Sequence, residues 1–223
     1  MTVSGTAAFT ASADNADIVL DELAVTGDVS ITTNGTSGNV TLVNATGIDF
    51  GSSTVGGNLA ATATGAITDS GALTIAGTST FTNTAGTNAA ITLDSSGNTF
   101  TGAVTFSTDS GSAVTIVDAT ALDLQALTAA SLSVSASGAI TDSGTLTIAG
   151  ASTFNSGSGN LTLDQTASTF GSLTLTGANV SVTENAALDL AGATISGTGS
   201  FNSRNNAITD SGTLTITGAS TFN

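Results

Sequence analysis

The sequence predicts an all-β chain that folds as a parallel β-helix, a solenoid whose coils stack along one axis. Three observations lead to this prediction: a 16-residue phrase occurs three times, short segments alternate apolar and polar residues, and proline is absent. Alternation with a period of two is typical of strands that have one buried face. Strands stacked between neighbours need every backbone N–H, which proline lacks. A repeat that is too short to form its own core buries its apolar face against the next copy.

The repeated phrase occupies residues 66–81, 139–154 and 207–222. Its isoleucines Ile67, Ile140 and Ile208 lie 73 and then 68 residues apart, and the segment from Val3 to Phe9 resembles the end of the phrase. The chain therefore reads as long repeats of about 70 residues, and residues 1–223 are expected to form one repeat segment.

Two further phrases divide each long repeat. One covers 91–100 and recurs at 161–170 and, more loosely, at 18–21; the other covers 114–124 and recurs at 182–190 and 40–50. Expected coil starts, in chain order, are residues 18, 40, 67, 91, 114, 140, 161, 182 and 208. Their spacing of 21 to 27 residues predicts about nine coils, three for each long repeat, in a rod about 40 Å long. A string of small sandwich domains would be expected to contain some Pro, Tyr or Trp and would have no such subperiod.

The expected strands place their apolar residues inward. Leu73-Thr74-Ile75 shows the pattern, and the same inward columns are expected to contain Leu122 with Leu124, Leu146 with Ile148, Leu188 with Leu190, and Leu214 with Ile216. Phenylalanine recurs at the end of the phrase, so one interior corner is predicted to hold Phe9, Phe81, Phe154 and Phe222. A sugar-stacking surface is the alternative reading of these rings, but large apolar side chains are usually buried. Asp-Ser-Gly, Ala-Gly and Ser-Gly clusters between the strands are typical of tight corners.

Composition restricts the function classes. The formal net charge is −15, with 16 acidic residues against one Arg, and no Cys or His is present. Such a surface repels phosphate backbones and anionic lipids, so we expect no nucleic-acid partner. The commonest transition-metal ligands and the usual general base near neutral pH are missing. We expect neither a signal peptide nor membrane insertion, since there is no basic leader and no run of about 18 apolar residues.

One acidic or amide residue per coil is the constellation most open to a functional reading. These residues are Asp21, Asn44, Asp69, Asp94, Asp118, Asp142, Asp164, Glu184 and Asp210. We expect them to lie in one column along a solvated corner, where Asp and Asn cap turns. The alternative is a column of weak Ca²⁺ sites, because the ligands would be oxygen only.

Other candidate chemistry is sparse. Asp118 with Asp123, or Asp14 with Asp17, provides paired carboxylates such as a polysaccharide lyase or hydrolase uses, but no Lys or His accompanies them and Arg204 lies in a polar stretch. Regular repetition also argues against one locally unusual catalytic coil. Outward threonines such as Thr74, Thr147 and Thr215 raise the alternative of a water-ordering, ice-responsive face. At the corresponding position the third phrase carries Asp49, Asp123 and Asp189, so the β-propensity of threonine is the simpler explanation.

The phrases at 139–154, 98–104 and 117–124 resemble the repeat region of filamentous-haemagglutinin-like large exoproteins, and the likeness covers nearly the whole chain. The resemblance implies a right-handed β-helical rod at the bacterial cell surface or in the extracellular space. We therefore expect an extracellular structural or adhesive module, an excerpt of a longer rod, with a host-cell, glycan or matrix partner that remains unknown. End-to-end self-association is a further expectation. We expect no enzyme activity, and we assign no catalytic, cofactor-binding or metal-binding residue.

Overall fold

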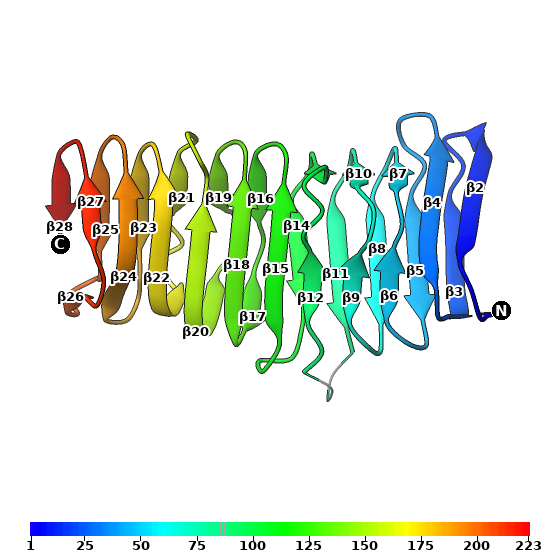
Figure 1. Ribbon diagram of the computed structural model, residues 1–223, viewed down its shortest axis with the longest axis horizontal. Coiled ribbons are helices and arrows are strands. Elements are labelled where there is room, and N and C mark those ends of the chain that lie inside the picture. Colours follow the sequence, from blue (N-terminus) through cyan, green and yellow to red (C-terminus); the bar gives the residue numbers. More distant parts are fainter. Residues whose placement is uncertain (85, 87) are drawn as a thin grey trace.

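A computed structural model describes residues 1–84, 86 and 88–223. In this part of the chain all the regular structure is β, and every strand pairing is parallel. The coils lie side by side along the long axis of a rod, with the N-terminus at one end and the C-terminus at the other (Figure 1). The predicted parallel β-helix is therefore confirmed.

One side of the rod is a 12-stranded sheet in which neighbours in space come from successive coils. Its strands, in spatial order, are β1 (Thr2–Val3), β3 (Ile18–Val25), β5 (Val40–Asn44), β8 (Leu59–Ala63), β11 (Ser79–Asn83), β14 (Val104–Ser107), β16 (Leu122–Leu124), β19 (Ile140–Asp142), β21 (Leu161–Leu163), β23 (Val180–Thr183), β25 (Gly199–Asn202) and β28 (Ser220–Phe222).

A 16-stranded sheet wraps the remaining sides. Its strands are β2 (Ala7–Asp14), β4 (Asp28–Asn34), β6 (Ile48–Phe50), β7 (Ser53–Val55), β9 (Ile67–Asp69), β10 (Leu73–Ile75), β12 (Ile91–Leu93), β13 (Thr99–Phe100), β15 (Ala113–Asp118), β17 (Leu127–Ala129), β18 (Ser131–Ala136), β20 (Leu146–Asn155), β22 (Thr169–Gly177), β24 (Leu188–Ile195), β26 (Ile208–Asp210) and β27 (Leu214–Ile216). The long strands β4, β20 and β24 each pair with two strands of a neighbouring coil, which joins two faces into one sheet.

The rod has about 11 turns, so the prediction of nine coils was slightly too low. In the 12-stranded sheet, hydrogen-bonded partners are 18 to 25 residues apart, as in Leu122 with Ile140 and Ser79 with Val104. Between Ile67 and Ile208, the described chain crosses this sheet seven times, from β11 to β25, where three coils per long repeat predict six crossings. Each long repeat therefore spans more than three turns.

Because the long repeat is not a whole number of turns, equal phrases occupy different sheets. In 66–81 the Ile-Thr-Asp segment is β9 of the 16-stranded sheet, whereas in 139–154 it is β19 of the 12-stranded sheet. The Ser-Thr-Phe segment lies in β11 of the 12-stranded sheet in the first copy and in β20 of the 16-stranded sheet in the second.

The aliphatic core agrees with the predicted inward positions. Leu73, Ile75, Leu122, Leu146 and Leu188 are all fully buried. Their expected arrangement in common columns is wrong, because β10, β16 and β20 lie on different faces; Leu146, for instance, pairs with Leu127. In the last coil, Leu214 and Ile216 are partly buried against the same core.

The prediction of a single corner that holds all four phenylalanines is also wrong, because copies of the phrase lie on different faces of the rod. Phe81 lies in the 12-stranded sheet and packs edge-on to Phe50 and Phe100, with ring centroids 6.2 and 6.1 Å away. Phe154 lies in the 16-stranded sheet, edge-on to Phe170 at 6.0 Å. Phe81 and Phe154 are fully buried, which removes the sugar-stacking reading for both. The others lie near the two ends: Phe9 in β2, half-buried, and Phe222 in β28, 48% exposed.

Candidate functional site

The acidic and amide residues do not form one solvated column. Five of them have buried side chains: Asn44, Asp69, Asp118, Asp142 and Glu184. The other four, Asp21, Asp94, Asp164 and Asp210, are exposed. The predicted solvated corner is therefore wrong for the five buried residues.

The alternation of side chains between the inner and outer faces of each strand explains which acids are buried and which are exposed. Asp69 follows Ile67 by two residues, as Asp142 follows Ile140 and Glu184 follows Val182, so each acid points to the same side as a buried aliphatic residue. Asp94 and Asp164 directly follow Leu93 and Leu163 and therefore point outward. Asp210 has the inward spacing but belongs to the last coil, where it is exposed.

Asp69 is the best satisfied of the buried acids. Its Oδ1 accepts the N–H of Asp94 at 2.8 Å, and its Oδ2 accepts Nδ2 of Asn98 at 2.6 Å. The Oδ1 of Asn98 in turn accepts the N–H of Leu73 at 2.8 Å. These contacts join the corner after β9 to the coil that follows it.

Asp142 occupies the same place in the second copy of the phrase, with fewer partners. Its Oδ1 accepts the N–H of Asp164 at 2.9 Å, but its Oδ2 is buried without a hydrogen-bond partner in the described structure. Ser168 stands where the first copy has Asn98, and its hydroxyl accepts the N–H of Leu146 at 3.0 Å.

Glu184 and Asp118 show the same half-satisfied state. Oε1 of Glu184 accepts the N–H of Phe170 at 2.7 Å, while Oε2 has no partner among the described residues. Oδ1 of Asp118 accepts the N–H and the hydroxyl of Thr120, both at 2.8 Å, and Oδ2 has none. Asp118, Asp142 and Glu184 thus each accept a main-chain N–H at a corner with one oxygen, while the other oxygen has no hydrogen-bond partner among the described residues.

Burial changes the proton affinity of these groups, since water is withdrawn from the charged form. Burial raises the pKa of Asp142 to about 7; the nearby carboxylate of Asp164 adds to the rise and the N–H of Asp164 opposes it. Burial likewise raises the pKa of Glu184 to about 7, against the hydrogen bond from Phe170. Burial also raises the pKa of Asp118, partly opposed by the hydrogen bonds from Thr120.

The paired carboxylates considered for catalysis do not form a common site. Asp118 ends β15 inside the rod, whereas Asp123 lies on the outer side of β16, where it accepts the hydroxyls of Thr141 and Ser143. Asp14 and Asp17 are exposed and accept hydrogen bonds from Asn34 and Asn39 of the next coil. Asp14, Asp17 and Asp123 thus link neighbouring coils, whereas Asp118 binds Thr120 of its own corner.

Outward threonines align more regularly than the sequence suggested. Thr10, Thr32, Thr54, Thr74 and Thr99 are direct partners in one column of the 16-stranded sheet. Thr147 and Thr215 lie in other columns. In the 12-stranded sheet, strands β5, β8, β11 and β14 present two parallel rows, Thr41-Ala60-Thr80-Thr105 and Val43-Thr62-Thr82-Ser107.

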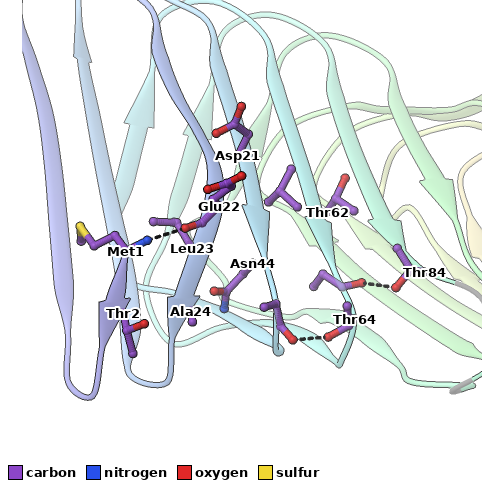
Figure 2. A pocket seen from close by; sticks show the side chains of 13 residues that line it. Met1, Thr2, Asp21, Glu22, Leu23, Ala24, Asn44, Thr62, Thr64 and Thr84 are labelled. Atoms are coloured by element: carbon purple, nitrogen blue, oxygen red, sulfur yellow. Dashed lines mark hydrogen bonds between the residues drawn. The ribbon is translucent and has the colours of Figure 1, made fainter.

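A groove of about 430 Å³ lies near the N-terminal end of the 12-stranded sheet. Figure 2 shows the carboxylates of Asp21 and Glu22 at its rim and the amino group of Met1, which donates to the main-chain oxygen of Glu22 at 2.7 Å. Thr64 and Thr84 donate to main-chain carbonyls, and the amide of Asn44 is bound by the chain. The groups of this groove that could act on a ligand are therefore mainly the two adjacent exposed carboxylates of Asp21 and Glu22. They lie at the bulge of strand β3.

Metal and cation chemistry gains no support from the described residues, among which no three His, Cys, Asp or Glu side chains gather in a way that could hold an ion. Arg204 is exposed, adopts a positive φ of 51° and donates from Nη1 to the main-chain oxygen of Thr166 at 2.6 Å. Within the same part of the chain, no helix has the length and apolarity needed to cross a lipid bilayer.

A family model for "Repeats of unknown function (DUF5649)" matches three successive segments, residues 37–107, 111–176 and 177–223. Neither a curated protein nor a solved structure is significantly similar to the chain. The matched segments cover most of the sequence and follow the long repeats. This repetitive β-solenoid chain therefore belongs to the DUF5649 repeat family.

Proposed function

We propose that the chain is a segment of an extracellular structural or adhesive rod of a bacterial surface or secreted protein, without catalytic activity. The observation that carries this proposal is the uninterrupted backbone ladder of the 12-stranded sheet, which runs from β1 to β28. Stacked coils of this kind give a stiff element whose length is set by the number of repeats. The likeness of the phrases to haemagglutinin-like exoprotein repeats supports the location and the adhesive role.

The hydrogen bonds of the carboxylates favour a structural rod over an enzyme. Buried acids bind main-chain N–H groups at the corners, and outer ones such as Asp17 and Asp123 bind groups of the next coil. A catalytic pair would instead need carboxylates that converge on an open cleft.

A glycan array combined with a reducing-sugar release assay tests the proposal. We expect binding to a subset of glycans or matrix components and no release of sugar from a panel of acidic and neutral polysaccharides. Release that disappears in the Asp14→Asn, Asp17→Asn double variant would overturn the non-catalytic assignment. Binding to none of the glycans, matrix proteins or host cells tested would overturn the adhesive part and leave a purely structural rod.

Self-association end to end belongs to the same proposal. Strands β27 and β28 each pair on one side only within the described chain, and Phe222 of the last coil is stacked on Phe201 at 5.2 Å with its other face open. A second copy that adds its first coil here would continue the parallel ladder. Sedimentation velocity should show concentration-dependent oligomers that Phe222→Asp abolishes; a monomer at every concentration would exclude stacking.

A water-ordering face is a second candidate, favoured by the double row on β5, β8, β11 and β14. The rows contain small hydroxyl and methyl side chains on a regular parallel sheet and no charged residue. An ice-recrystallisation assay tests this candidate, with Thr80→Lys as the variant that interrupts one row. Recrystallisation that proceeds equally with and without the parent protein would remove it.

A further inference from the structure

Three successive corners of the C-terminal half form what we call the acid corner: Asp142 at the end of β19 with residues 143–145 before β20, residues 164–168 between β21 and β22, and residues 184–187 between β23 and β24. Hydrogen bonds tie these loops together across coils. The N–H of Asp164 donates to Asp142, the N–H of Asn185 donates to the main-chain oxygen of Ser168, and Glu184 accepts the N–H of Phe170. The acid corner therefore depends on two interior carboxyl groups.

The two copies of the phrase allow Asp142 to be compared with Asp69, its counterpart in the first copy. In the first copy of the phrase, the amide of Asn98 uses its oxygen for Leu73 and its nitrogen for Asp69. In the second copy, the hydroxyl of Ser168 accepts from Leu146 but provides no donor for the carboxylate. Oδ2 of Asp69 also accepts the N–H of Ser95 at 3.3 Å, whereas Oδ2 of Asp142 is buried and has no partner among the described residues.

We propose that Asp142 and Glu184 are a proton-linked latch, which keeps the acid corner closed while the carboxyls are neutral and loosens it when they ionise. A buried neutral carboxyl with one open oxygen costs far less than a buried carboxylate with the same open oxygen. The ionised carboxylates can be stabilised only if water or a hydrogen-bond donor reaches Oδ2 of Asp142 or Oε2 of Glu184. Since the interior provides no such donor among the described residues, the corner must open toward solvent.

The surrounding charges do not neutralise the latch. Asp164, on the adjoining coil, points outward but is a like charge close enough to raise the pKa of Asp142. On the outer faces of neighbouring strands, Asp123 and Asp189 accept hydroxyls of Ser143 and Ser211. The guanidinium of Arg204, on the coil after Glu184, is exposed and bound to the main-chain oxygen of Thr166.

The sign of the expected pH effect follows from the two proton affinities. Folding raises the pKa of Asp142 and of Glu184 to about 7, above the values near 4 of an unfolded chain. The folded state therefore holds more protons than the unfolded state between about pH 4 and pH 7. The stabilisation is complete below that window and is lost as the pH rises through about 7.

Thermal melts at pH 5 and pH 8 test the latch in the whole chain. We expect the parent to melt at least about 5 °C lower at pH 8, because a shift of this size in two groups corresponds to several degrees in a chain of this length. Ser168→Asn restores the donor that Asn98 supplies to Asp69, and Glu184→Gln removes the second ionisable group. Each variant should reduce the difference between the two pH values, and the double variant should reduce it further, leaving the contribution of Asp118, whose pKa is also raised by burial.

Two variants beside the first copy of the phrase test the same idea from the other side. Asn98→Ser removes the donor from Asp69 and should enlarge the difference, whereas Asp94→Asn, an exposed acid in the first copy, should leave it unchanged. Because the readout is a difference within each variant, a general loss of stability does not obscure it. Equal melting temperatures of the parent at both pH values, or a full pH effect in the Ser168→Asn, Glu184→Gln variant, would overturn the proposal.

Hydrogen exchange gives the local readout. The protection factors of the Asp164 and Phe170 amides, which donate to the two carboxyls, should fall from pH 5 to pH 8 more than that of Thr92 in β12. A uniform fall across the chain would contradict a latch located at this corner.

Discussion

At the scale of single residues, the interior rings are the largest contributors to packing. Phe154 is fully buried and lies between Val134 and Leu175 of the neighbouring coils. Its edge also meets the ring of Phe170 at 6.0 Å. A side chain enclosed in this way contributes both its transfer from water and the absence of a cavity.

Phe154→Ala should therefore lower the free energy of unfolding by about 3 to 5 kcal/mol. Chemical denaturation measures this change. Phe222→Ala is the matched control, because the same phrase ends there with a ring that is 48% exposed, and it should cost much less. Equal effects of the two variants would contradict the observed burial.

The hydroxyl of Thr120 should control the ionisation of Asp118. It donates to Oδ1 at 2.8 Å and so favours the charged form, while burial raises the pKa of the carboxyl. Thr120→Val should raise the pKa of Asp118 further, so that the associated loss of stability at neutral pH becomes larger. A carboxyl NMR titration measures the pKa, and Thr120→Ser, which keeps the hydroxyl, should leave it near the parent value.

The burial of the acids could be predicted from the sequence, because Asp69 and Glu184 follow inward aliphatics by two residues and therefore share their side. The absence of a hydrogen-bond partner for Oδ2 of Asp142 could not be predicted from the sequence. It depends on which residue of the next coil faces Asp142, and this pairing becomes known only with the register. The change from Asn98 to Ser168 is a visible signal once both copies of the phrase are aligned to the structure.

At the scale of elements, corners limit the sequence more strictly than strands do. The strands of the phrase tolerate a change of sheet between copies, since both settings offer parallel partners on each side and an inward face. The glycine of Asp-Ser-Gly is different. A Cβ atom at Gly71, Gly144 or Gly212 would lie 2.2, 2.1 or 1.8 Å from a main-chain atom of the preceding coil.

Gly144→Ala should consequently push two coils apart at the corner between β19 and β20. We expect a loss of about 1 to 3 kcal/mol in stability, as for overpacking of a close contact. Gly5→Ala is the control, because no atom lies within 4 Å of a Cβ there and the change should have little effect. Urea unfolding of both variants gives the comparison; a neutral Gly144→Ala would mean that the coils separate easily.

At the scale of the whole molecule, the sequence predicted the solenoid but not its number of turns. Strand alternation and repeated phrases are local, so they identify the fold class directly. The phase of a phrase around the axis depends on the summed lengths of all the corners before it. The step from Ser79 to Val104 is 25 residues and the step from Leu122 to Ile140 is 18, and no local pattern indicates this difference.

A solenoid with independent coils should survive the removal of one complete turn. Leu59 pairs with Ser79 and Val40 pairs with Leu59, so deletion of residues 59–78 removes β8, β9 and β10 and brings β5 into register with β11. The same deletion places β6 beside β12 and β7 beside β13 with all side chains facing as before. The shortened chain should keep its β-sheet circular dichroism and a cooperative melt, because each coil contacts only its neighbours.

Deletion of residues 59–68, half of that turn, is the matched control. It removes β8 and most of β9, leaves β10 without its place in the ladder, and should abolish the cooperative melt. X-ray scattering should also show a shorter rod for the full-turn deletion and an expanded chain for the half-turn deletion. If both deletions unfold the protein to the same extent, stability depends on the whole rod at once, and the nearest-neighbour description of this solenoid is wrong.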